Sequence, residues 1–585
     1  RFAARKKIKP LLEAADALVK IEDYRTKIGR SERTDSVVEP RLSKQWFVDM
    51  KQFAADALEA VRSKEVTFYP EHMFNMYYSW LNEDNIRDWC ISRQLWWGQR
   101  IPAWYYKEDV FVATTEAEAL AQAQAKYPNV TLADLQQDED VLDTWFSSWL
   151  WPMSVFDGFE NQEELRYYYP TSVLVTGWDI MFFWVARMII SGYEFAPELL
   201  GQAHPSMPFR DVYFTGMVRD EKRQKMSKSK GNSPDALALI DNYGADGVRF
   251  GMLLSGAAGN DIIFDAPIDK ATKQVINESQ RCLQGRNFCN KMWNALRLIK
   301  GWEISEDAPS AVNQLAAQWF DHKLQQTLES LAQSLETYRL SEGLMTLYNF
   351  IWGDFCSWYL EMIKPAYGQP IDRTTLDQTI IFYEQLMTML HPFMPFVTEE
   401  IWHQLKERKQ GEDCIVSTYP KADSYDQAMI EKVEKAKELT AKVREIRNTK
   451  GLSPKEALPL FVHQTDASTS LYELVGLKAM IVKMANLTDL SFTDADELDS
   501  TIAFLSGTEK YFLEVQLTID VAAERAKLQK ELTHQRGFLK GVEKKLSNER
   551  FVNNAPAAVV EKERKKLADG QARVKILEES LASLN

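Results

Sequence analysis

The sequence predicts a protein of several domains: a parallel α/β region, an all-α antiparallel bundle, a small mixed α/β module and a C-terminal coiled-coil hairpin. Three observations lead to this prediction. At about 100 to 200 residues per domain, 585 residues are too many for one hydrophobic core. Apolar residues form short strand-like runs up to position 270 and follow helical spacing beyond it. Residues 521–585 carry a heptad pattern.

Composition and charge limit the class of protein. Hydrophobic residues make up 45% and aromatic residues 12%, enough to fill several cores. The net charge of −14 argues against a protein that coats nucleic acid over its whole surface. Two segments are nevertheless basic: residues 1–10 carry five positive charges and no acid, and residues 521–585 carry 14 Lys or Arg against 9 Asp or Glu. A polyanionic partner or a solvated helix face would each account for them.

Cysteine usage indicates the compartment. The five cysteines form no CxxC and no pairing pattern, which favours reduced thiols and a cytoplasmic location. The sequence contains no apolar run of about 18 residues, so no membrane partner is expected. The opening RFAARKKIKP lacks both an initiator methionine and the apolar core of a signal peptide, so we expect a piece of a longer chain.

Residues 46–270 are predicted to form the parallel α/β region. The runs SVLVTGWDI and DVYFTGMV have the length and composition of buried strands, and each is followed by a helical or loop segment. Residues 107–140 are polar and are predicted to be an insertion.

Three further parts are predicted after it. In residues 271–420 apolar side chains recur at helical spacing, as in a bundle, and His391 and His403 are expected to pack rather than bind metal. Residues 421–520 combine a basic helix around KVREIRNTKG with short strands at ALPLFV, IAFL and YFLEVQL. Residues 521–585 are predicted to form two heptad helices around a break at 553–556. Periodicity alone does not show whether these helices pack on the protein or reach a partner. Their heptad positions are Leu528, Leu532, Gln535, Leu539, Val542, Leu546, Val560, Leu567, Val574, Leu577, Leu581 and Leu584.

A lysine-rich loop, KMSKSKGN at 225–232, follows the strand-like DVYFTGMV and precedes a helix that Ser233 and Pro234 begin. Basic loops at the carboxyl ends of parallel strands meet phosphates, and the compact ammonium of lysine suits a mobile contact. Taken alone, the loop would be interpreted as an ordinary basic surface loop without a role.

Four segments in order resemble the valyl-tRNA synthetases, a family of class I aminoacyl-tRNA synthetases: DWCISRQLWWGQRIPAWY, DVLDTWFSSWLWP, TGWDIMFFWVARM and KMSKSKGN. The resemblance runs along the whole chain. It implies the exit of an inserted editing domain at 1–45, the second half of a Rossmann-type catalytic domain at 46–270, an anticodon-binding domain at 271–420 and a tRNA-binding arm at 521–585. Residues 421–520 remain a small α/β module.

The resemblance also implies the chemistry: activation of valine by ATP, with Mg²⁺ expected, and transfer to tRNA(Val). It assigns Lys225 and Lys228 to the ATP phosphates, where positive charge stabilises the transition state. Ser227 keeps the loop polar and flexible. Gly177 lets a nucleotide approach the backbone, and Asp179 accepts hydrogen bonds from a ribose hydroxyl.

Trp145, Ile180 and Trp184 match the family's amino-acid pocket. Two indoles and a branched aliphatic side chain exclude anything longer than valine, and a polar residue would be expected at 180 in an isoleucine enzyme. Such a cavity cannot reject threonine, which has the shape of valine plus a hydroxyl, so the resemblance implies editing in the parent protein.

Two features depart from the family. The HxGH signature of the first catalytic half is absent, so the chain alone is expected to bind tRNA without activating valine. The 107–140 insertion lacks the cysteine pairs of some relatives, so no structural zinc and no other metal are expected. The alternatives are an isoleucyl-tRNA synthetase fragment and a non-catalytic tRNA-binding module. A monomer is expected.

Overall fold

The computed structural model describes residues 2–31, 34–39, 42–227, 230–272, 274–453, 455–515 and 521–548, with single positions between 560 and 574. Its internal contacts divide the chain into two compact units. Unit 1 consists of Arg1–Met217 and Ala257–Asp261, and unit 2 of Val218–Gly256 and Ile262–Asn585. The division falls inside the predicted catalytic domain, whose boundaries remain a prediction. None of the described helices is long and apolar enough to cross a membrane.

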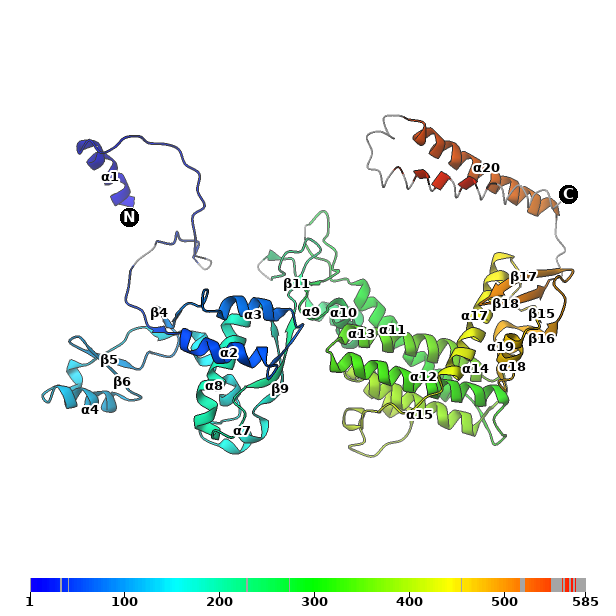
Figure 1. Ribbon diagram of the computed structural model, residues 1–585, viewed down its shortest axis with the longest axis horizontal. Helices are drawn as coiled ribbons and strands as arrows, with labels where there is room; N and C mark the ends of the chain where they lie inside the picture. Colours follow the sequence, from blue (N-terminus) through cyan, green and yellow to red (C-terminus); the bar gives the residue numbers. More distant parts are fainter. Residues whose placement is uncertain are drawn as a thin grey trace. The chain divides into compact units, whose positions relative to one another are not determined.

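A parallel three-stranded sheet organises unit 1, as the sequence predicts. The strands lie in the order β2 (Thr67–Tyr69), β10 (Phe209–Thr215) and β9 (Thr171–Gly177). Val212 of β10 pairs with Phe68 and Leu174, and all three side chains are buried. Four helices contribute to this core: α2 (Lys51–Arg62), α3 (Met73–Leu81), α5 (Thr144–Ser148) and α8 (Ala186–Leu200), of which α2, α3 and α8 are labelled in Figure 1. Helices α6 (Trp151–Ser154) and α7 (Gln162–Tyr168) form a second small core with α8.

The segment predicted as an insertion carries its own small structure. It forms an antiparallel sheet in the order β6 (Asp109–Val112), β5 (Ala103–Tyr106) and β7 (Gln136–Gln137), with helix α4 (Glu116–Lys126). The central strand β5 precedes the predicted start of the insertion at 107. Phe111, Ala123 and Val130 form one of its two small cores. Four two-residue strands complete unit 1: β1 (Phe47–Val48) pairs with β3 (Trp89–Cys90), and β4 (Ser92–Arg93) with β8 (Val141–Leu142).

Unit 2 begins with the lysine loop. Strand β11 (Val218–Arg219) pairs in parallel with β12 (Ile262–Ile263), and helices α9 (Ala236–Tyr243) and α10 (Ala245–Ser255) lie between them in the sequence. Asp246 of α10 is buried and accepts the N–H groups of Phe396 and Val397 at the start of α16 (Pro395–Leu405). This contact ties the loop-bearing segment to the bundle that follows.

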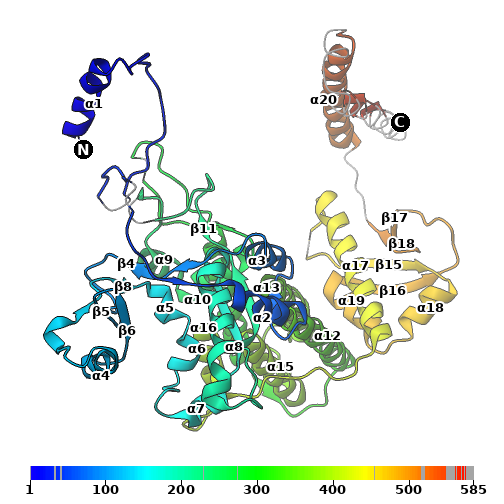
Figure 2. The same ribbon diagram turned by 60° about the vertical axis from the view of Figure 1, so that its left-hand side comes forward.

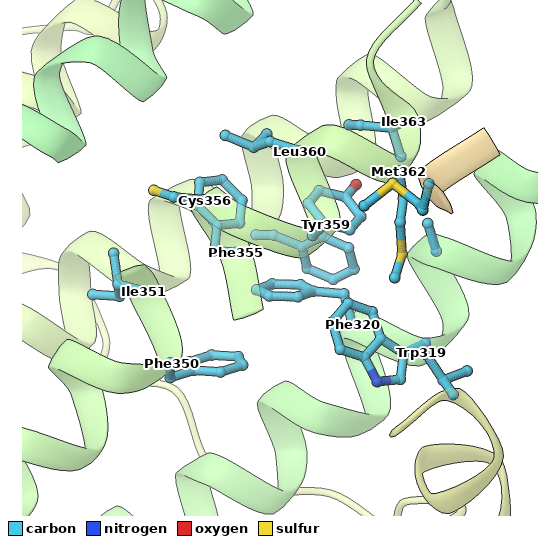
Figure 3. Packing of buried hydrophobic residues seen from close by; sticks show 14 of the residues in the cluster. Trp319, Phe320, Phe350, Ile351, Phe355, Cys356, Tyr359, Leu360, Met362 and Ile363 are labelled. Atoms are coloured by element: carbon cyan, nitrogen blue, oxygen red, sulfur yellow. The ribbon is translucent and has the colours of Figure 1, made fainter. Parts of the chain in front are cut away.

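The predicted bundle is present, and an aromatic core holds it together. Phe320 is fully buried and stacks on Phe350 with ring centroids 5.0 Å apart, beside Phe355 and Tyr359 (Figure 3). The bundle consists of α11 (Gln280–Lys300), α12 (Ala311–Glu336), α13 (Leu340–Asn349), the π-helical stretch Phe350–Tyr359, α14 (Leu360–Ile363), α15 (Arg373–Leu390) and α16 (Pro395–Leu405), with short strands β13 (Ile304–Ser305) and β14 (Ile371–Asp372).

The small α/β module has a four-stranded mixed sheet, with helices beside it (Figure 2). The order is β16 (Leu487–Thr493), β15 (Leu458–His463), β18 (Glu509–Glu514) and β17 (Thr501–Ser506), and the helices are α17 (Gln427–Thr449), α18 (Asp466–Tyr472) and α19 (Leu477–Ala485). Three of these strands are predicted from the sequence, and β16 is not, because its LTDLSFT contains polar residues.

Two helices lie at the ends of the described chain: α1 (Phe2–Ala14) and α20 (Val521–Leu546). Helix α20 is the first helix of the predicted hairpin. The predicted break at 553–556 lies outside the described residues, as does most of the second helix.

Candidate functional site

The TGWD segment lies at the carboxyl end of a parallel strand, the position at which open α/β sheets bind ligands. Strand β9 ends at Gly177, and a turn at Trp178–Ile180 leads through the π-helical Met181–Val185 into α8. A Cβ atom on Gly177 would lie 2.5 Å from Oδ1 of Asp179. A side chain at 177 would therefore displace the exposed Asp179 carboxylate.

The two predicted pocket tryptophans lie in neighbouring helical turns. Trp145 is in α5 and stacks on Phe183, with ring centroids 5.8 Å apart. The Trp184 indole N–H donates to the carbonyl of Ser148, also in α5, at 3.1 Å. Trp145, Ile180 and Trp184 are all half-buried. The hydrogen bond fixes the orientation of the Trp184 ring relative to the helix that carries Trp145.

A buried carboxylate connects three of the quoted motifs, and the sequence reasoning did not select it. Asp143 caps α5 and accepts the Trp89 indole N–H at 3.0 Å. It pairs with Arg93 at 3.0 Å and with Arg187 at 3.9 Å. The Arg187 guanidinium also lies 3.5 Å from the Trp89 ring centroid, and burial lowers the pKa of Arg187 to about 10. In the sequence, the cluster was indicated only by Arg187, a charged residue within the apolar run FFWVARM.

A cavity of 650 Å³ borders this cluster in unit 1. Its walls include Trp89, Arg93 and Arg187, together with Trp80 and Phe182, which stack at 4.1 Å. Aromatic faces and guanidinium groups therefore line one hollow beside the quoted motifs.

The lysine loop is described except for two of its residues. Lys228 and Ser229 lie outside the described residues. Lys225 and Lys230 are exposed, Ser227 is half-buried, and Met226 packs against buried Leu239 and Phe264. Within the described chain, the Lys225 ammonium has no hydrogen-bond or ion-pair partner. Unit 2 carries this loop, whereas unit 1 carries Gly177, Asp179 and the pocket residues.

One group in the described chain has the spacing of a cation site. Nε2 of His403 lies 3.2 Å from Glu399 and 3.1 Å from Asp413. The Glu399 carboxylate also accepts the backbone N–H groups of Cys414 and Ile415. The group therefore closes the loop after α16, because the His403 ring lies within hydrogen-bonding distance of both carboxylates. The expectation of no bound metal remains a prediction.

Comparison with known proteins gives three family matches. Residues 12–265 match the tRNA synthetases class I (I, L, M and V), residues 317–462 the anticodon-binding domain of tRNA ligase, and residues 520–585 the valyl tRNA synthetase tRNA binding arm. The valine–tRNA ligase of Bacteroides fragilis is 50% identical over 592 residues, and that of Fusobacterium nucleatum is 40% identical over 601 residues. Each alignment covers 100% of this chain and 64% of the relative.

Solved structures also match. Mycobacterium tuberculosis methionyl-tRNA synthetase bound by methionyl-adenylate is 16% identical, with a TM-score of 0.44 over 68% of this chain and 71% of that chain. The LeuRS of a ternary complex from Agrobacterium radiobacter is 16% identical, with a TM-score of 0.42 over 67% of this chain and 47% of that chain.

Proposed function

We propose that the chain belongs to the valyl-tRNA synthetases of class I and serves as the C-terminal part of a valine–tRNA ligase. The observation that carries the proposal is 50% identity to a valine–tRNA ligase along the entire chain. The chain spans 64% of that relative's length, so the proposed activity belongs to the complete enzyme. There the valine carboxylate attacks the α-phosphate of ATP, pyrophosphate leaves, and the valyl group passes to tRNA.

In this proposal the lysine loop acts on the phosphates. Negative charge develops on the phosphoryl oxygens as pyrophosphate leaves, and Lys225 and Lys228 stabilise it, with Ser227 as a polar neighbour. Mg²⁺ would be bound with ATP. The exposure of Lys225 supports this role, because a lysine held in an ion pair would have to leave its carboxylate partner before it could bind a phosphate.

Unit 1 supplies the contacts to valine and the nucleoside. Trp145, Ile180 and Trp184 form an apolar wall that fits a small branched side chain. Asp179 accepts a hydrogen bond from the ribose, and Gly177 leaves room for the nucleotide at the end of β9. The fixed Trp184 indole supports the pocket assignment, since a rigid wall discriminates by size better than a mobile one.

We assign the binding of tRNA to the helical parts of the chain. Residues 271–420 and 521–585 would contact tRNA, in keeping with the anticodon-binding and binding-arm matches. The surplus of basic residues at 521–585 suits a phosphate backbone. Residues 421–520 would form a separate module, and 1–45 would lead from an editing domain. All five cysteines are free, which supports a cytoplasmic location. We propose a monomer.

The test uses a chimaera in which this chain replaces the matching region of the Bacteroides fragilis enzyme. We expect valine-dependent ATP–pyrophosphate exchange and valylation of tRNA(Val). Exchange with isoleucine in place of valine would overturn the assigned amino acid. A chimaera that folds and binds tRNA but exchanges with neither would overturn the enzymatic proposal in favour of a tRNA-binding module.

A further inference from the structure

The two ends of the lysine loop are joined by a pair of side chains, Asp220 and Asn232. The Asn232 amide donates to Oδ2 of Asp220 at 2.9 Å, across the loop. Asp220 is 3% exposed although it lies in a polar turn. We call this pair the Asp220–Asn232 clasp.

Each half of the clasp also holds the loop backbone. Oδ1 of Asp220 accepts the N–H groups of Lys222 at 2.9 Å and Gln224 at 2.8 Å. Oδ1 of Asn232 accepts the N–H of Ser227 at 3.0 Å, and its amide also donates to the carbonyl of Lys225 at 3.3 Å. Backbone on both sides of Lys225 is therefore fixed by two side chains.

The chemistry of the clasp suits a phosphate-binding loop. A carboxylate among lysines would neutralise an ammonium if it bound one directly. Here both Asp220 oxygens accept N–H groups, and the Asn232 hydrogen bond lowers the pKa of Asp220. The negative charge thus orders the backbone while the Lys225 side chain stays exposed.

We propose that Asp220 and Asn232 are positioning residues that hold the lysine loop in the conformation that presents Lys225 to phosphate. This inference rests on the proposed function for its catalytic consequence, but the clasp itself can be tested without activity. Neither residue is assigned a contact with substrate.

The decisive variant exchanges the two side chains. In Asp220→Asn, two amide groups face each other. The pair then separates, Asn232 turns and loses the Ser227 N–H, or the new amide at position 220 turns and loses the N–H groups of Lys222 and Gln224. In Asn232→Asp, two carboxylates face each other. In the double variant, the new amide at position 220 donates to the new carboxylate at position 232, and that carboxylate still accepts the Ser227 N–H. The 3.3 Å bond to the Lys225 carbonyl is lost, and a carboxylate oxygen then faces that carbonyl oxygen, so the rescue is expected to be incomplete.

Hydrogen–deuterium exchange of the Gln224 and Ser227 amides in this chain measures the clasp directly, because each amide donates to one of its two residues. Each single variant is expected to accelerate exchange of at least one of these amides by about tenfold, the effect of one lost hydrogen bond, and the double variant to return both to within about threefold. Asp269→Asn is the matched control, because Asp269 also accepts two backbone N–H groups, from Ala271 and Thr272, but lies in a different turn. Unchanged exchange in the single variants, or a double variant no better than them, would overturn the clasp.

The effect of the clasp on catalysis is measured by steady-state kinetics of the chimaera. The single variants should lower kcat for valine-dependent exchange about tenfold and leave KM for valine within about twofold, and the double variant should recover kcat. Faster amide exchange with unchanged kcat would overturn the positioning role while leaving the proposed function intact. If the unmodified chimaera showed no ATP–pyrophosphate exchange, that result would count against the proposed function. The amide hydrogen-exchange measurements would still show whether the clasp exists.

Discussion

Neutralising one face of helix α20 should weaken tRNA binding without disturbing the packing of the helix. Lys530, Lys540 and Lys544 are exposed, whereas Leu532, Leu539 and Val542 are buried. At about 100° per residue, the centres of the two sets lie about 150° apart around the helix axis. The triple change of these lysines to alanine therefore removes charge from one face and leaves the apolar face intact.

The magnitude follows from counterion release. Three lost phosphate contacts should make the slope of log affinity against log salt about 2 to 3 units less negative. At about 0.1 M salt, relative to about 1 M where this contribution vanishes, the tRNA affinity should fall about 100- to 1,000-fold. The assay is titration of tRNA(Val) into the chain at several salt concentrations, with helicity followed by circular dichroism.

A packing variant serves as the control. Leu532→Ala with Leu539→Ala damages the apolar face and keeps every charge, so it should reduce helix stability and leave the salt slope nearly unchanged. If the triple lysine variant kept both the affinity and the slope of the parent chain, electrostatic contact between α20 and tRNA would be refuted. The basic surplus would then belong to a solvated helix face.

Three further predictions concern the active site and the bundle. The purified chain alone should show no valine-dependent ATP–pyrophosphate exchange, because it carries no HxGH segment to hold ATP opposite the lysine loop; robust exchange would contradict this. In the chimaera, Lys228→Ala should slow valyl-adenylate formation in single-turnover kinetics and change valine affinity little, whereas the reverse pattern would count against a role at the transition state. Tyr383→Phe should lower the stability of the bundle by about 1 to 2 kcal/mol in hydrogen exchange, since it leaves the buried Met292 carbonyl without a 2.6 Å hydrogen bond. Tyr419→Phe removes a 3.4 Å bond and should cost less.

Local patterns in the sequence were sufficient to predict the fold class. Periodicity and strand composition depend on neighbouring residues, so the parallel strands, the bundle and the first arm helix could be predicted before any contact was known. Strand β16 was missed because its LTDLSFT lacks a clear alternation. Its identity as a strand depends on pairing with β15, which lies far away in the sequence.

The site residues also divide into those that a local pattern predicted and those that depend on contacts between distant segments. Lys225, Lys228, Gly177, Asp179 and the pocket residues were selected because they fall in contiguous motifs, and their roles remain predictions. Asp143 and Arg187 were not selected, since their importance arises from an ion pair between segments that the sequence separates.

The amino-acid sequence by itself determined the order of the parts, the resemblance to a synthetase family and the chemical character of the lysine loop, because each is written in contiguous residues. The tertiary structure alone decided which polar groups meet. Asp220 and Asn232 are twelve positions apart, and only the folded turn brings an amide within 2.9 Å of a carboxylate. A hydrogen bond requires atoms at that distance and in that orientation, and no one-dimensional pattern specifies either.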